Sequence, residues 1–153
     1  MTNIEYKILL TKIKTLGRYQ IYVSGMSMFP CLLPNDLITI ESQDEYNIGN
    51  VVVFLYKHGE ILVHRIVKKN NYTIFCKGDN SFRLEDIQES QIVGKVISYC
   101  RNGLNCLIKA ADEEFINMSY RVGQEFRKVG YDKEKLMLTK NYIKYYYRYI
   151  KID

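Results

Sequence analysis

The sequence predicts a mainly β protein with appended helices: a coiled, mostly antiparallel β-sheet that follows a short N-terminal helix and precedes two C-terminal helices. Two observations predict this fold class. Short runs rich in β-branched residues alternate with turn residues through the middle of the chain, and apolar residues recur at helical spacing near both ends. The six expected strands span residues 20–23, 37–40, 51–56, 61–67, 72–75 and 92–98.

Turn residues separate these runs and fix where the strands end. Asn35-Asp36, Asn70-Asn71 and Gly78-Asp79-Asn80 each lie between two expected strands. His58-Gly59 lies between the runs at 51–56 and 61–67, and this spacing predicts a hairpin.

The helical segments lie at the two ends. Over residues 4–16, Leu9, Ile13 and Leu16 share one face, several lysines flank it, and Gly17 marks the end. Residues 110–129 and 133–150 also have helical character and are separated by Gly130. We therefore expect an N-terminal amphipathic helix over residues 1–18, a β catalytic domain over 19–109 and a helical extension over 110–153.

Composition excludes several classes of protein. The 153 residues include 22 Lys plus Arg and 17 Asp plus Glu, a net charge of +5, with 47% hydrophobic residues and only 2 prolines. These values are typical of a globular domain and exclude disordered or collagen-like chains. A membrane-spanning helix needs about 20 apolar residues, and no run approaches that length. Lysines interrupt the N-terminal segment, so we expect no secretory signal and a cytoplasmic protein, with peripheral binding to the inner membrane as the alternative.

The four cysteines, at positions 31, 76, 100 and 106, form no C-x-x-C pair. In an intracellular chain we expect reduced thiols rather than disulfides. A zinc site with His58 or His64 is not supported by the spacing, so no metal or organic cofactor is predicted.

A serine-rich turn is the first candidate for chemistry. The segment from Val23 to Pro30 carries Ser24 and Ser27 beside Gly25, directly after an apolar strand. A serine in such a turn can present its hydroxyl and nearby backbone N–H groups to one point, as acyl transfer requires. By itself the segment is better explained as a bend with solvated serines, because Ser-Gly turns are common.

Two more segments carry polar groups of catalytic type. Alternation along residues 61–67 places His64 on a face with Leu62 and Ile66, where a histidine is either a base or a satisfied core residue. The run Lys77-Gly78-Asp79-Asn80 is followed by Glu85-Asp86, and its simplest explanation is a polar turn.

Together, these segments resemble the signal peptidase I and SOS-repressor-type serine peptidases. In that family the nucleophile lies in an S-M-x-P box, which Ser27-Met28-Phe29-Pro30 matches. A K-G-D-N box matches residues 77–80. Further resemblance lies at residues 33–38, 48–54, 63–67 and 92–96, so that it covers about residues 20–98.

Departures from the family pattern refine the resemblance. Asn35 replaces a usual glycine, and Asn50 replaces a usual aspartate. The base strand carries His64 where repressors and bacterial membrane signal peptidases have lysine, which resembles the endoplasmic-reticulum and sporulation-type signal peptidases. Gly25 stands where the family often has a serine that completes the oxyanion hole.

The resemblance implies a role for each residue. Ser27 is the nucleophile and His64 the general base. An acid orients His64, and we favour Asp86, near the family's usual position, with Asp79 supporting the turn as the alternative acid. The backbone around Met26 and Ser27, assisted by Ser24, is expected to form the oxyanion hole. The full set of expected oxyanion and substrate-binding residues is Ser24, Gly25, Met26, Met28 and Pro30.

The predicted function is therefore a serine endopeptidase that removes a leader or signal segment from a precursor bound as an extended strand. Two alternatives remain: a repressor-like domain that cleaves its own chain, although no Ala-Gly or Cys-Gly site precedes Ser27, and an inactive peptide-binding module. Only 26 residues precede Ser27, so we expect no DNA-binding segment. A C-terminal stripe of Lys140, Lys144, Arg148 and Lys151 predicts either a solvated helix face or a surface that binds an acidic leader or an anionic membrane, and no nucleic acid is expected.

Overall fold

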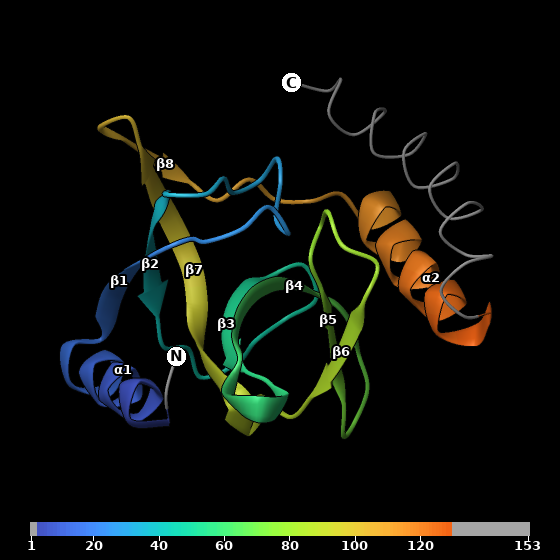
Figure 1. Ribbon diagram of the computed structural model, residues 1–153, viewed down its shortest axis with the longest axis horizontal. Helices are drawn as coiled ribbons and strands as arrows, with labels where there is room; N and C mark the ends of the chain where they lie inside the picture. Colours follow the sequence, from blue (N-terminus) through green and yellow to red (C-terminus); the bar gives the residue numbers. More distant parts are fainter. Residues whose placement is uncertain (1–2, 130–153) are drawn as a thin grey trace.

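The computed structural model describes residues 3–129 and shows a coiled antiparallel sheet with one helix at each end (Figure 1). The helices are α1 (Asn3–Leu16) and α2 (Glu113–Val129). The strands are β1 (Arg18–Tyr22), β2 (Leu37–Glu41), β3 (Val51–Leu55), β4 (Ile61–Lys69), β5 (Ile74–Lys77), β6 (Leu84–Ile87), β7 (Ile92–Arg101) and β8 (Leu104–Leu107). The predicted fold class is confirmed. The predicted helix over 133–150 and its basic stripe lie outside the described residues.

The sheet has the order β1-β2-β7-β3-β4-β5-β6, with β8 paired to β7, and each pairing is antiparallel. Register shifts within the β2–β7, β3–β7 and β4–β5 pairs bend the sheet on itself. The coil brings β4, β5 and β6 together as a compact unit on the side of the molecule that α2 covers (Figure 1).

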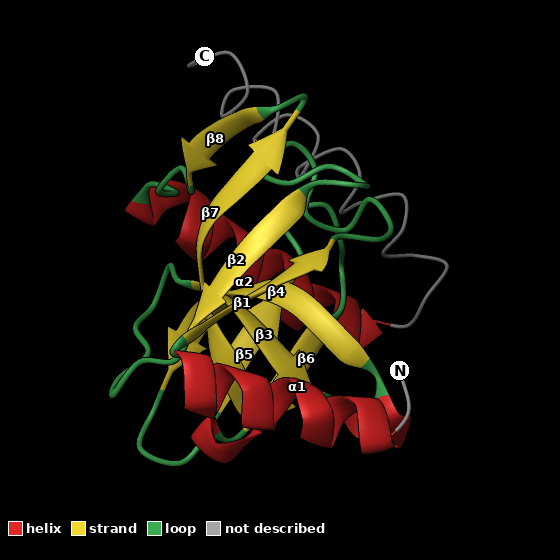
Figure 2. Cartoon of the chain, turned by 90° about the vertical axis from the view of Figure 1, so that its left-hand side faces the viewer, coloured by secondary structure: helices red, strands yellow, loops and turns green. Residues whose placement is uncertain are grey.

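The N-terminal helix spans nearly the predicted residues, but Leu16 is exposed and does not share the buried face. Its buried face carries Leu9 and Ile13, which join β1, β2 and β7 in one core cluster. Gly17, with φ of 75°, ends the helix, and its N–H donates to the carbonyl of Ile13. Figure 2 shows α1 lying across one end of the sheet. Among residues 3–129, no helix is long and apolar enough to cross a membrane.

Two strands were missed by the sequence prediction, and one was placed too early. β6 and β8 are only four residues long, too short to show a clear alternation of apolar and polar residues. β5 begins at Ile74 and not at residue 72, because the Asn70 side chain accepts hydrogen bonds from the N–H groups of Tyr72 and Thr73 and holds both in a turn.

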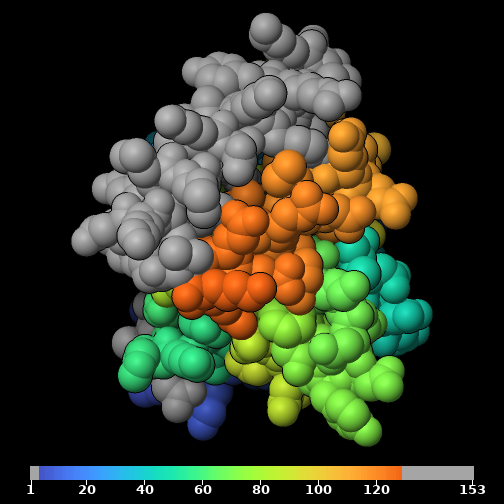
Figure 3. Space-filling view, turned by 90° about the vertical axis from the view of Figure 1, so that its right-hand side faces the viewer, coloured from blue at the N-terminus to red at the C-terminus, as the bar shows by residue number. Residues whose placement is uncertain are grey.

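The C-terminal helix begins at Glu113 and not at residue 110. The Asp112 side chain accepts a 2.7 Å hydrogen bond from the Phe115 N–H, which caps the first turn. Figure 3 shows α2 lying on the outer surface against the strands that follow residue 70, and its contacts are with β4, β5 and β6.

Candidate active site

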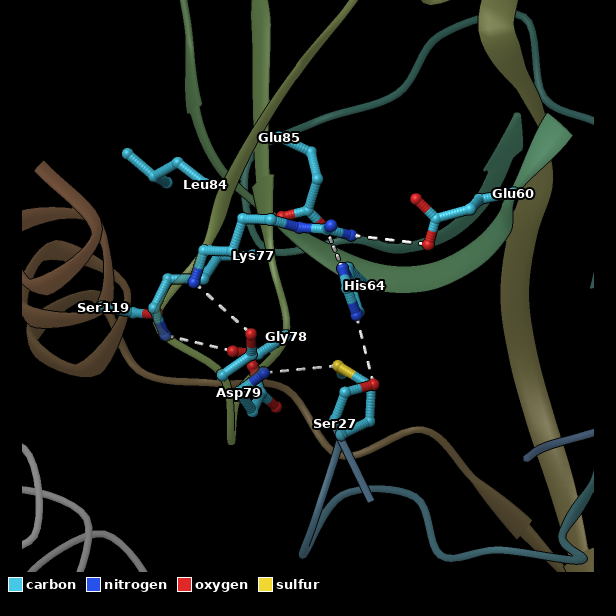
Figure 4. Close-up of polar contacts among 12 residues, drawn as sticks. Ser27, Glu60, His64, Lys77, Gly78, Asp79, Leu84, Glu85 and Ser119 are labelled. Carbon is cyan, nitrogen blue, oxygen red and sulfur yellow. Dashed lines mark hydrogen bonds and ion pairs between the residues drawn. The ribbon is translucent and has the colours of Figure 1, made fainter. Parts of the chain in front are cut away.

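Ser27 and His64 come from distant parts of the chain and meet at one side of the sheet (Figure 4). Ser27 lies in the loop after β1, and His64 lies on β4. The Ser27 Oγ is 3.1 Å from His64 Nε2, within hydrogen-bonding distance. The imidazole is almost fully buried, and the Phe54 ring packs edge-on against it. The base is therefore held in a fixed orientation against the serine.

Glu85 completes a chain of three polar side chains. Its Oε1 accepts a short hydrogen bond from His64 Nδ1, and its carboxylate is fully buried. The register explains the position: β4 pairs with β5, β5 pairs with β6, and Glu85 lies opposite Cys76 on β5. Ser27, His64 and Glu85 thus have the nucleophile–base–acid order of a catalytic triad.

The predicted assignment of the acid to Asp86 does not agree with this geometry. Asp86 is about half exposed and forms an ion pair with Arg127 on α2. The alternative, Asp79, is bound on both carboxylate oxygens by Arg65, at 2.9 Å each. Among the hydrogen bonds and ion pairs of residues 3–129, neither carboxylate is paired with His64. Asp86 faces away from it because adjacent residues on a strand point to opposite faces.

One signal in the sequence favours Glu85. Ile87 is buried in the same core cluster as Phe54 and Ile66, and Glu85 lies two residues before it. Alternation therefore places Glu85 on the interior face of β6. The prediction missed this because β6 itself was not recognised as a strand.

The turn that follows β5 binds the nucleophile loop directly. The Asn80 N–H donates to the Ser27 carbonyl at 2.8 Å, and the Asn80 side-chain amide donates to the Met26 carbonyl at 3.1 Å. A Cβ at Gly78 would lie 2.6 Å from the Ser27 carbonyl oxygen and 3.1 Å from His64 Nε2. Glycine is therefore required at 78 for the turn to approach both residues.

Asp79 supports this turn, as the sequence analysis proposed for it. Besides its paired bonds from Arg65, its N–H lies 3.4 Å from the Met28 sulfur. Arg65 also donates to the Gly49 carbonyl at 2.9 Å. Arg65 and Asp79 are both fully buried, so this ion pair compensates two charges that water does not reach.

Lys77 is a buried cation close to the site. Its ammonium group donates to the Gly78 carbonyl at 3.0 Å and to the Ser119 hydroxyl on α2 at 2.9 Å. Burial lowers the pKa of Lys77 from 10.5 to about 7, against the opposing effect of Asp79 and Glu85. Burial, and secondly Glu85, raise the pKa of the nearby Cys76 thiol well above its usual value, so this cysteine stays protonated.

The expected oxyanion and substrate-binding residues lie around Ser27. Ser24, Gly25 and Met26 are exposed in the preceding loop, and Gly25 has φ of 78°. Met28 is buried in the core beneath the loop, and Pro30 is half-buried. Met28 thus anchors the loop from inside, whereas the three residues before Ser27 are exposed to solvent.

Asn35, one of the two departures from the family pattern, has a local explanation. It has φ of 73°, a left-handed conformation that asparagine tolerates better than most residues, so it can replace the usual glycine. The adjacent Asp36 accepts two hydrogen bonds from Arg101, and its carbonyl accepts from the Val23 N–H at 2.8 Å. The strand before Ser27 is therefore held in place.

Comparison with protein families assigns the chain. A model described as Peptidase S24-like matches residues 5–97, more than half of the sequence. The chain belongs to the Peptidase S24-like family. A search of curated proteins found no match. The family assignment supports a fold shared by serine peptidases and repressors, and the matched range contains Ser27, His64 and Glu85.

Proposed function

We propose that this Peptidase S24-like protein is a serine endopeptidase that removes a leader or signal segment from a precursor peptide. The observation that carries the proposal is the hydrogen-bonded chain from Ser27 through His64 to Glu85. The resemblance of the boxes at 27–30 and 77–80 to signal peptidases supports a leader segment as the substrate class.

The proposed reaction proceeds through an acyl-enzyme. Ser27 Oγ attacks the scissile carbonyl while His64 Nε2 accepts its proton, and the imidazolium then protonates the leaving amine. Water, activated by the same nitrogen, hydrolyses the ester and restores Ser27. The Glu85 carboxylate fixes the proton on Nδ1 and stabilises the imidazolium. These steps require no metal or organic cofactor.

The oxyanion would be bound by the backbone of the nucleophile loop. Within the described chain, the Ser27 N–H donates no hydrogen bond to another backbone group. It is available to the developing negative charge on the carbonyl oxygen. Gly25 has no side-chain hydroxyl to donate to this oxygen. The hydroxyl of the neighbouring, exposed Ser24 would be the second donor.

A free strand edge beside His64 supports binding of an extended substrate. Residues 61–65 of β4 pair with β3 on one side, whereas β5 pairs only with residues 65–69 on the other. The second edge of residues 61–64 is thus unpaired within the described sheet and leads to His64. A precursor added as a strand along this edge would have its scissile bond placed at Ser27.

Labelling with a fluorophosphonate tests the proposal. The protein should acquire one adduct, located by peptide mass mapping at Ser27, and cleave a model precursor. Ser27→Ala and His64→Ala should abolish cleavage with little change in thermal stability, since removing either member of such a unit disables it. Ser42→Ala, at an exposed serine outside the site, is the matched control and should still be labelled. An unlabelled Ser27 in folded protein would instead indicate a peptide-binding module.

A further inference from the structure

Helix α2 lies outside the matched residues 5–97. It nevertheless contacts β6, the strand that carries Glu85, at three points. Its Arg127 donates to the Leu84 carbonyl at 2.9 Å and pairs with the Asp86 carboxylate. A Cβ at Gly123 would lie only 2.3 Å from Leu84 Cγ, so the helix backbone is pressed against the Leu84 side chain. The residues on both sides of Glu85 are thus held by one helix.

A fourth contact of α2 reaches the turn beside the nucleophile. The fully buried Ser119 hydroxyl accepts a 2.9 Å hydrogen bond from Lys77, whose ammonium also donates to the Gly78 carbonyl at 3.0 Å (Figure 4). A Cβ at Gly78 would lie 2.6 Å from the Ser27 carbonyl oxygen and 3.1 Å from His64 Nε2, so this turn approaches both residues closely. A displacement of α2 would therefore move the turn that supports the serine.

We propose that α2 is a positioning element of the catalytic site, with Ser119 and Arg127 as its positioning residues. Ser119 acts through Lys77 on the turn at Gly78, and Arg127 acts through Leu84 and Asp86 on Glu85. Neither residue touches the reacting atoms. The inference rests on the proposed function, because it assigns these residues to the same triad.

The physical reason is the small tolerance of a triad for misplacement. Glu85 is on a four-residue strand at the end of the sheet order, with β5 as its strand neighbour. Such a strand depends on other contacts to fix its position, and α2 supplies them. A shift of about 1 Å in a positioned group can lower a rate about 10²-fold.

The test compares Ser119→Ala and Arg127→Met with Gln124→Ala, a control at an exposed position on the same helix. The kcat for a model precursor should fall about 10-fold or more in Ser119→Ala, with KM unchanged. Arg127→Met should lose several-fold, and Gln124→Ala nothing. Thermal melting establishes that each variant is folded.

A spectroscopic measurement tests the position of His64 independently of peptidase activity. The proton shared by His64 Nδ1 and Glu85 is observed by NMR, and the exposed His58, the other histidine of the chain, is the internal reference. The resonance of the His64 Nδ1 proton should shift or broaden in Ser119→Ala and Arg127→Met, while the resonances of His58 stay constant. This arm tests α2 even if no peptidase activity is found, and unlabelled wild-type Ser27 would refute only the proposed function.

Full kcat and an unchanged His64 signal in folded Ser119→Ala would overturn the inference. An equal loss of kcat in Gln124→Ala would overturn it too, because the effect would then be a general one of the helix. If Ser119→Ala does not fold, kcat and the His64 signal of Arg127→Met test the inference instead. This variant should fold, because the Arg127 side chain is partly exposed and its replacement leaves no buried cavity.

Discussion

Replacing Glu85 by glutamine tests the acid of the triad with the smallest change in shape. The Glu85 Oε1 accepts the His64 Nδ1 hydrogen, which leaves Nε2 without a hydrogen and facing Ser27 Oγ. A glutamine can turn its amide NH2 toward Nδ1 and favour the other tautomer. Nε2 would then carry a hydrogen and could not accept the serine proton.

The expected loss of kcat in Glu85→Gln is large because the Glu85–His64 pair is buried. A carboxylate-to-amide change at a triad acid lowers kcat by about 10⁴-fold, which corresponds to about 5.4 kcal/mol of transition-state free energy. The free energy of unfolding should change little, by about 1 kcal/mol or less. The Glu85 Oε2 has no hydrogen-bond partner among residues 3–129, and a neutral amide removes a buried charge without changing the side-chain volume.

The assay is single-turnover acylation of Ser27 together with steady-state cleavage of a model precursor. Asp86→Asn is the matched control, since the neighbouring carboxylate is exposed and pairs with Arg127. It should lose activity several-fold at most, as expected for Arg127→Met, because exposed ion pairs contribute about 1 kcal/mol or less. An active Glu85→Gln beside an inactive, folded Asp86→Asn would refute the assignment.

Three more predictions concern the turn beneath the site. Burial lowers the pKa of Lys77 from 10.5 to about 7, so between these values the unfolded chain binds more protons and stability rises with pH. Denaturant titrations should show wild type gaining about 2 kcal/mol over Lys77→Met between pH 7 and 9, and an equal pH dependence of the two proteins would contradict the lowered pKa of Lys77. Gly78→Ala should slow acylation of Ser27 at least tenfold, because its methyl group must displace the Ser27 carbonyl; an unaffected rate would show that the turn is not in contact. Asp79→Asn should lower the free energy of unfolding by about 3 kcal/mol, since it leaves Arg65 buried without its charge partner, and a melting temperature equal to wild type would exclude that role.

The sequence was sufficient for the parts of the site that depend on local pattern. Ser27 follows a strand and precedes Pro30, and His64 lies on a long strand with clear alternation, so both could be placed from spacing and resemblance. The acid could not be placed in this way. Its identity depends on which of two adjacent carboxylates faces the interior, and that is decided by the pairing of β6 with β5 and by the packing of α2.

The three carboxylates near the site differ in what surrounds them and not in their chemistry. Asp79 is neutralised by the paired bonds from Arg65, so its charge is already compensated and cannot be directed at His64. Asp86 pairs with Arg127 at the surface, where water screens its charge. Glu85 is buried against the imidazole and has its salt bridge to His64. In the proposed acylation, a positive charge that forms on His64 would therefore be stabilised most strongly by Glu85, because the two side chains are in contact and the dielectric around this buried pair is low. The arginines thus bind two of the three carboxylates and leave the third to act on the base.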